Sequence, residues 1–177
     1  MPRAASQNLK ITLEPIARTN KRTLENLFQL YVHDFTELWA GEDRGDIGEE
    51  GLFEGDTLDL LWDDPEASHF LIRNGRALAG FAIVNTYAHS GRLLDWSVAE
   101  FFVLRKHRKA GVGCSAAHAL FARFPAGSWE AAIALKNVAA LRFWRGAIQS
   151  YPNAADITER AGDGERWTGQ IIRFRTI

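Results

Sequence analysis

A run of cations and glycines in the middle of the chain has the residue types that hold an anionic ligand. It reads Arg-Lys-His-Arg-Lys-Ala-Gly-Val-Gly and spans residues 105–113. Glycines let the backbone approach a ligand closely and adopt positive φ angles. Where such a loop opens a helix, the helix adds unpaired N–H groups and the positive end of its dipole. The pattern therefore predicts a phosphate site, most simply a pyrophosphate site.

The flanking segments predict a strand before this loop and a helix after it. Residues 98–104 are rich in aromatic and branched side chains and are short enough for a buried strand. Beyond the loop, apolar residues recur at helical spacing: Ala116, Ala117, Leu120, Phe121 and Phe124. The chain thus offers a strand, a basic glycine-containing loop and a helix, in that order.

Glu100 is a charged residue inside the otherwise apolar strand. Burial disfavours an ionised carboxylate and would raise the pKa of Glu100 toward neutrality, which suits a general base. The alternative is a glutamate on the solvent-facing side of its strand, and the sequence leaves both interpretations open.

A second segment, residues 137–144, reads Asn-Val-Ala-Ala-Leu-Arg-Phe-Trp. Together with the R-x-x-G-x-G pattern of residues 108–113, it resembles the GNAT family of N-acetyltransferases. The resemblance covers roughly residues 67–148. It implies a GNAT-like α+β fold, with a mixed, largely antiparallel central sheet and helices on both faces. We expect residues 1–177 to form one such domain.

The resemblance also implies that acetyl-CoA is the co-substrate, that no metal takes part, and that the reaction is direct attack of an amine in a ternary complex. In the family, the strand before the loop parts from the next strand and pairs with the pantetheine arm. The backbone N–H of Leu104 would then polarise the thioester carbonyl. The residues assigned to the cofactor are Phe102, Val103, Leu104, Arg108, Lys109, Ala110, Gly111, Val112, Gly113, Cys114, Asn137, Phe143 and Trp144.

Trp144 departs from the family pattern, because many relatives carry there a tyrosine that serves as the general acid. An indole has no proton of useful acidity, so the acid must come from elsewhere. Tyr151 is the substitute that the sequence suggests. Cys114 follows the glycine loop, and we interpret it as a residue that lines the cofactor site, not as a nucleophile.

The acidic residues gather in one part of the chain. Residues 42–66 hold eleven acidic residues and one basic residue, whereas residues 100–177 hold twelve basic and six acidic ones. Solvated loops would explain this, but so would a basic half that holds an anionic cofactor and an acidic half that attracts a cationic acceptor.

His33, Asp34 and Glu37 lie within one helical turn and are candidates to bind a small amine acceptor. His33 and Glu37 alone are too few for a metal site.

Composition excludes several classes of protein. The chain has 177 residues, a net charge of −1 and 46% hydrophobic residues, which is ordinary for a folded domain. No apolar stretch reaches membrane-spanning length, and the first residues lack the core of a signal peptide, so we expect a cytoplasmic protein without membrane partners. The near-neutral charge argues against nucleic acid as a partner. The single Cys114 excludes an internal disulfide. A homodimer is left open.

The remaining pattern predicts a strand over 9–13 and a helix from Thr19 or Asn20 to Leu38. One apolar stripe of that helix would consist of Leu24, Leu27, Phe28, Tyr31, Phe35 and Leu38. A short helix over 57–62 that stops before Asp64-Pro65, a hairpin of 69–73 and 77–87 that turns at Asn74-Gly75, and a strand over 93–104 should follow. Strands are expected at 129–135 and 165–176. A GNAT-like domain that senses acyl-CoA without turnover is the alternative function, and Trp144 is the residue that favours it.

Overall fold

The computed structural model describes residues 10–53 and 57–177, and within these ranges seven strands form one mixed sheet, in the order β1-β2-β3-β4-β5-β7-β6. Only β4 and β5 pair in parallel, and all other neighbouring strands in these ranges are antiparallel. The strands are β1 (Ile11–Pro15), β2 (Ser68–Asn74), β3 (Ala77–Asn85), β4 (Trp96–Val103), β5 (Gly127–Ala134), β6 (Ala154–Ala161) and β7 (Gly169–Thr176).

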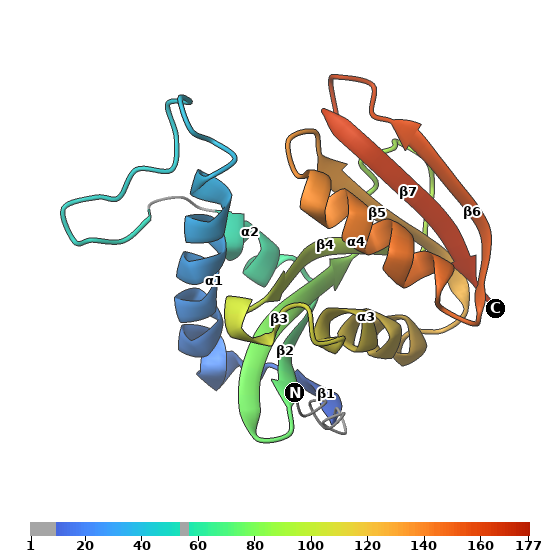
Figure 1. Ribbon diagram of the computed structural model, residues 1–177, viewed down its shortest axis with the longest axis horizontal. Helices are drawn as coiled ribbons and strands as arrows, with labels where there is room; N and C mark the ends of the chain where they lie inside the picture. Colours follow the sequence, from blue (N-terminus) through green and yellow to red (C-terminus); the bar gives the residue numbers. More distant parts are fainter. Residues whose placement is uncertain (1–9, 54–56) are drawn as a thin grey trace, which may run out of the picture.

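Helices cover both faces of this sheet (Figure 1). α1 (Lys21–Thr36) and α2 (Thr57–Asp63) lie on one face, and α3 (Val112–Arg123) and α4 (Val138–Gln149) lie on the other. Each pair of helices buries its own core against the sheet, with Leu24 and Phe81 in the first and Leu120 and Trp129 in the second. This arrangement confirms the predicted α+β fold with a mixed, largely antiparallel sheet and helices on both faces.

β4 changes its pairing in the middle of the strand. Glu100 pairs with Ile83 of β3 and Val98 pairs with Val84, so Ala99 is an extra residue that forms a β-bulge. The parallel pairing with β5 covers Trp96–Val98 and ends there. The edge of β4 from 99 to 103 is therefore not paired with β5, and the two strands diverge toward the loop that follows β4.

Most predicted elements occur, and several of their boundaries differ. β1 spans Ile11–Pro15 where 9–13 was expected, and residue 9 lies outside the described residues. α1 ends at Thr36 instead of Leu38, β4 begins at Trp96 instead of residue 93, and β7 begins at Gly169 instead of residue 165. Asn20 stands at the start of α1 but makes no side-chain capping bond there. β6 was not predicted. It is an edge strand whose residues are mostly exposed, so its sequence lacks the alternation that a half-buried strand shows.

The acidic segment after α1 projects away from the sheet, as the cyan part of Figure 1 shows. An isolated bridge pairs Ile47 with Phe53, and the side chain of Gln29 bonds both backbone groups of Phe53. Of the helices in the described ranges, none has the length and apolar character needed to cross a bilayer.

Candidate active site

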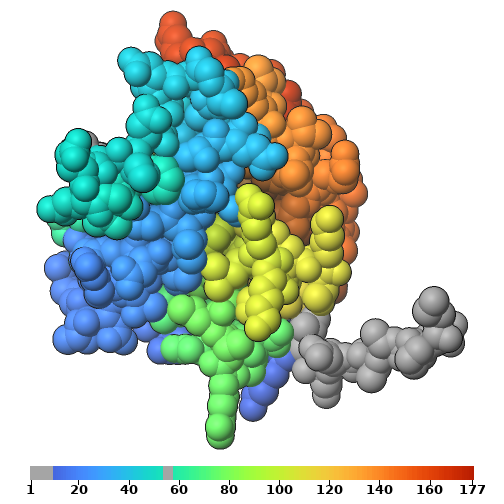
Figure 2. Space-filling view, turned by 60° about the vertical axis from the view of Figure 1, so that its left-hand side comes forward, coloured from blue at the N-terminus to red at the C-terminus, as the bar shows by residue number. Residues whose placement is uncertain are grey.

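A cavity of about 580 Å³ opens at the unpaired edge of β4. α1 reaches it from one face of the sheet, and the first turns of α3 and α4 reach it from the other. These segments meet on one face of the molecule in Figure 2, where they are blue, yellow and orange. The lining residues are Tyr31, Asp34, Phe35, Glu37, Leu38, Phe101, Phe102, Val103, Arg105, Arg108, Lys109, Gly111, Gly113, Cys114, Asn137, Ala139, Ala140 and Phe143.

The basic glycine loop forms one end of this cavity. Lys109 and Gly111 both have left-handed backbone conformations, with φ of 60° and 80°. α3 begins at Val112, and among the described residues no side chain caps its first turn. The first N–H groups of α3 thus remain available to a ligand. Gly113 packs against Phe143, and a Cβ atom on it would lie 3.1 Å from the ring.

Asp34 ties α1 to this loop. Its carboxylate accepts hydrogen bonds from Arg105, at 2.8 Å, and from Arg108. Burial opposes ionisation of Asp34, but the bonds from the two arginines outweigh it and lower the pKa of the carboxyl. Arg108 also donates to the carbonyl oxygen of Val103, at 2.7 Å. The negative charge of Asp34 is therefore paired with the two arginines of the loop.

Glu100 lies on the α1 face of β4, and the hydroxyl of Tyr31 donates a hydrogen bond to its carboxylate. Burial raises the pKa of Glu100 to about 7, although the bond from Tyr31 acts in the opposite direction. Burial and the nearby charge of Glu100 also raise the pKa of Tyr31. Tyr31 lines the cavity, whereas Glu100 is partly exposed and is not among the lining residues. The two groups form one hydrogen-bonded pair.

The N–H of Leu104 is not free to act on a ligand, which corrects the prediction that it polarises a carbonyl. It donates to the carbonyl of Ala79 at 2.8 Å and so extends the ladder between β3 and β4. Backbone groups alternate in direction along a strand. The N–H groups on the opposite edge, which β5 has left, are those of Phe101 and Val103.

The second sequence motif begins α4 at the other side of the cavity. Asn137 caps this helix, and its side-chain oxygen accepts from the N–H of Ala140 at 3.0 Å. Phe143 lines the cavity and stacks on Phe101, with ring centroids 5.7 Å apart. Trp144 is 7% exposed, belongs to the core and is not part of the lining. The structure therefore brings Phe143, and not Trp144, to the cavity.

Cys114 lies on the cavity lining, and its sulfur is 3.6 Å from both His118 Nε2 and Ser150 Oγ. His118 was not singled out in the sequence, although its i, i+4 spacing from Cys114 was visible there. Nε2 of His118 also bonds the carbonyl of Ala147 at 2.9 Å. Tyr151 packs against His118 and Phe121 outside the cavity.

The three residues proposed to bind the acceptor do not all face the cavity. Asp34 and Glu37 line the cavity, whereas His33 is exposed outside the lining and faces Phe53. No group of three or more His, Cys, Asp or Glu side chains within residues 10–53 and 57–177 is placed to hold a metal ion.

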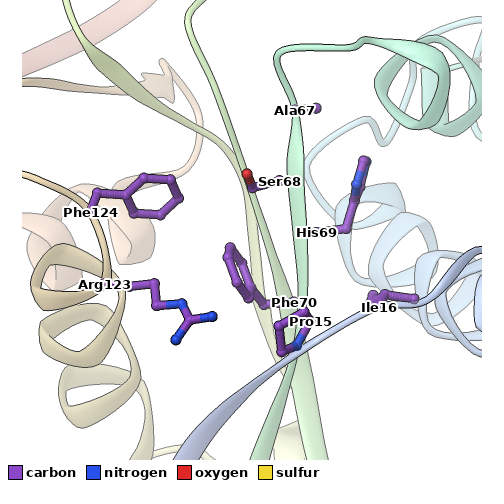
Figure 3. A pocket seen from close by; sticks show the side chains of 8 residues that line it. All are labelled: Pro15, Ile16, Ala67, Ser68, His69, Phe70, Arg123 and Phe124. Carbon is purple, nitrogen blue, oxygen red and sulfur yellow. The ribbon is translucent and has the colours of Figure 1, made fainter.

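A second hollow, of about 390 Å³, lies at the other end of the sheet. Figure 3 shows Phe70, Phe124 and Arg123 on one side of β2, and His69 with Ile16 on the other. His69 is held by a bond of 2.9 Å to the carbonyl of Leu61. None of the candidate residues from the sequence lies here.

Comparison with known proteins places the chain among acetyltransferases. The sequence profile of the Acetyltransferase (GNAT) family matches residues 24–147. An acetyltransferase from Thermus thermophilus has a similar structure, with a TM-score of 0.61 and 16% identity over 94% of this chain and 96% of that one. A GNAT-family acetyltransferase from Staphylococcus aureus has a TM-score of 0.58 and 10% identity over 93% and 98%.

Spermidine N-acetyltransferase from Vibrio cholerae, in complex with CoA and spermine, has a TM-score of 0.55 and 11% identity over 95% of each chain. At these identities the solved structures establish a shared fold. A search of curated protein sequences returns no match.

Proposed function

Because the chain belongs to the GNAT family of acetyltransferases, we propose that it transfers an acetyl group from acetyl-CoA to a small amine, and that the cavity beside β4 is where it does so. The observation that carries this proposal is that one cavity has an anion-binding loop at one end and a candidate base beside the other. A basic loop with an uncapped helix start lies at one end, and a hydrogen-bonded pair that includes a carboxyl with a pKa of about 7 lies beside the other.

The loop suits the pyrophosphate of CoA. Left-handed Lys109 and Gly111 turn the backbone into α3, whose first N–H groups have no side-chain partner among the described residues. Arg105, Arg108 and Lys109 add positive charge on the lining. Phosphate groups bind such helix starts through backbone N–H bonds and the helix dipole.

The unpaired edge of β4 suits the pantetheine arm. The ladder with β5 ends at Val98, so the backbone from 99 to 103 can bond the amides of the arm as an added strand would. Asn137 and Phe143 would border the arm from α4. We assign the thioester oxygen to a backbone N–H of this edge, from Phe101 or Val103, since the N–H of Leu104 is occupied.

Glu100 is the proposed general base. An amine must be neutral to attack the thioester carbon, and its nitrogen must lose a proton as the amide forms. A carboxyl with a pKa of about 7 is largely ionised just above neutral pH, and it is a stronger base than an ordinary glutamate. We propose that Glu100 takes this proton directly or through a water molecule.

The acceptor is proposed to be cationic outside its reacting nitrogen. Asp34 is neutralised by two arginines, so Glu37 is the lining carboxylate left to receive a positive group. The acidic segment that follows α1 would draw cations toward the same opening. His33 lies away from the cavity and has no role in this proposal.

An assay of CoA thiol release from acetyl-CoA, with a panel of amines, tests the proposed function. Diamines and polyamines should give turnover, and amines that carry a carboxylate should give less. The acetylated product is identified by mass spectrometry. Turnover confined to acidic amines would contradict the proposed cationic acceptor. Binding of acetyl-CoA without turnover on any amine would contradict the proposed acetyl transfer.

That last outcome would favour a second candidate function, a domain that binds acyl-CoA without chemistry. The specific observation in its favour is Trp144, which stands where many relatives carry a catalytic tyrosine and lies buried in the core. The two functions differ in whether another group supplies the acid.

A further inference from the structure

The reaction needs an acid as well as a base, because the departing CoA sulfur must gain a proton. Tyr151, the acid that the sequence suggests in place of the family tyrosine, is not placed to supply it, and neither is the position of Trp144. Trp144 is buried with its ring against Phe101 and Phe121, and Tyr151 packs behind α3 against His118. Both lie outside the cavity lining.

Tyr31 is the tyrosine that does line the cavity. It comes from α1, on the face of the sheet opposite α4, where family members carry their acid. Its ring is fixed by aromatic neighbours, with centroids 5.3 Å from Phe28, 4.7 Å from Phe35 and 5.7 Å from Phe102. These contacts hold the hydroxyl on Glu100, beside the unpaired edge of β4.

We propose that Tyr31 is the general acid of this enzyme, and that Tyr31 and Glu100 together carry a proton from the amine nitrogen to the CoA sulfur. This inference rests on the proposed function. It assigns a role to a residue that the sequence places only in the apolar stripe of α1.

The proton balance closes within the pair. The amine nitrogen forms a bond to the thioester carbon, and its proton passes to the Glu100 carboxylate. The carbon–sulfur bond breaks, and the sulfur takes the hydroxyl proton of Tyr31. The proton on Glu100 then moves along the existing hydrogen bond to the Tyr31 oxygen. The products are the amide and the free thiol, and both residues return to their starting states.

The pairing also sets the order of the two transfers. Burial raises the pKa of the Tyr31 phenol, and the negative charge of ionised Glu100 raises it further. Once Glu100 has taken the amine proton, that charge is gone and Tyr31 becomes a stronger acid. Asp34 of α1 and Arg108 of the loop also line the cavity, and their opposite charges are paired with each other.

Tyr31→Phe removes the hydroxyl and keeps the ring in its aromatic cluster. We expect kcat to fall by about 10²–10⁴-fold with acetyl-CoA, the usual effect of losing an acid. With an acetyl-CoA analogue that carries selenium in place of sulfur, the selenolate is a better leaving group and needs less protonation, so the fall should be much smaller. Tyr87→Phe is the matched control, since Tyr87 is 56% exposed and contacts His89 away from the cavity.

Three results would overturn the proposal while leaving the proposed function intact. They are wild-type kcat in Tyr31→Phe, an equal fall with both donors, and the loss appearing in Tyr151→Phe instead. A wild type that turns over no amine would count against the proposed function.

Carbon-13 NMR of the glutamate carboxyls tests the pair without turnover. The Glu100 signal is assigned by its absence in Glu100→Gln. Because the bond from Tyr31 lowers the pKa of Glu100, its titration midpoint should move upward in Tyr31→Phe. A midpoint that does not move would show that the two groups are uncoupled, and would overturn the proposal on its own.

Discussion

At the scale of single residues, the environment of Glu100 decides what its carboxyl can do. The side chain lies on the α1 face of β4, and its carboxylate accepts a hydrogen bond from the hydroxyl of Tyr31. Burial disfavours its ionised form more than this single bond favours it, so the pKa rises to about 7. A surface glutamate would be ionised but weakly basic at neutral pH, whereas this one exchanges a proton in the range where an enzyme works.

The first prediction concerns Glu100→Gln, which keeps the shape of the side chain and removes its basicity. We expect kcat/KM to fall by about 10²–10⁴-fold at pH 8. Glu100 must be ionised to accept a proton, so wild-type activity should rise with pH through about 7, and the variant should lack this limb. One acceptor must be used throughout, since the amine has a titration of its own.

The control for this experiment is Glu165→Gln, an exposed glutamate in the segment before β7. It should keep the wild-type profile. CoA affinity should be almost unchanged in both variants. If Glu100→Gln kept wild-type kcat/KM across pH 6 to 9, roughly the window of a raised carboxyl pKa, another residue would have to be the base.

Residue types predicted part of this site. Glu100 was visible as a charge in an apolar strand, and the glycines of the loop were visible by their spacing. Tyr31 could not be recognised as a site residue, because its helical spacing places it in the apolar stripe of α1. Only the tertiary packing shows that its hydroxyl bonds Glu100. The pairing of Asp34 with two arginines also joins residues far apart in the sequence. The Leu104 prediction failed because it depends on which strand edge faces β3.

At the scale of elements, β4 makes the cavity by pairing differently along its length. It is parallel to β5 up to Val98, bulges at Ala99 and then keeps only its contact with β3. That contact is unusually close at Gly80, where a Cβ atom would lie 1.8 Å from the carbonyl oxygen of Phe102. Gly80 therefore lets β3 hold the segment of β4 that lines the cavity.

The second prediction follows from this close approach. Gly80→Ala should destabilise the protein by at least about 1–3 kcal/mol, the cost typical of overpacking, because the obstructing atom is backbone and cannot rotate away. The matched control is Gly146→Ala on the open side of α4, where a Cβ atom meets nothing within 4 Å. That change should stabilise the helix by about 0.5–1 kcal/mol. Urea denaturation measures both, and equal midpoints for the two variants would contradict the packing argument.

Elements with strong hydrophobic periodicity or clear turn residues could be predicted from the sequence. Features that depend only on pairing with adjacent strands could not. The α1 stripe, the Asn74-Gly75 hairpin and the short helix before Asp64-Pro65 all occur where the sequence placed them. β6 was not predicted, because an exposed edge strand has no buried face and so shows no alternation of apolar and polar residues. The β-bulge at Ala99 could not be predicted either, since it depends on the register between β3 and β4 and not on residue type.

At the scale of the whole molecule, the charges are divided between the two sides of the cavity. The acidic segment after α1 projects on one side, and the basic loop after β4 lies on the other. Each of them also makes an ion pair with a neighbouring element: Glu42 of the acidic segment bonds Lys136, just before α4, at 2.5 Å, and Arg105 of the basic loop bonds Asp34 of α1 at 2.8 Å. This distribution suits two substrates of opposite charge.

The third prediction is that the apparent KM for a cationic acceptor rises with ionic strength. Long-range attraction between exposed charges is screened beyond about 8 Å at physiological salt. A neutral amine acceptor serves as the control and should show a weaker dependence at saturating acetyl-CoA. Equal salt dependence of the two acceptors would show that the acidic segment does not steer the acceptor.

The central claim, that the cavity beside β4 holds CoA by the loop before α3, is tested most directly by calorimetric titration of CoA into two Gly→Asp variants. Gly111 and Gly75 both have positive φ, 80° and 61°, so the substitutions bring similar backbone strain and the same charge. Of the two, Gly111 alone lines the cavity. We predict that Gly111→Asp weakens CoA binding by about 100-fold or more, about 2.8 kcal/mol, while Gly75→Asp binds like the wild type. Unchanged affinity in Gly111→Asp would contradict the account.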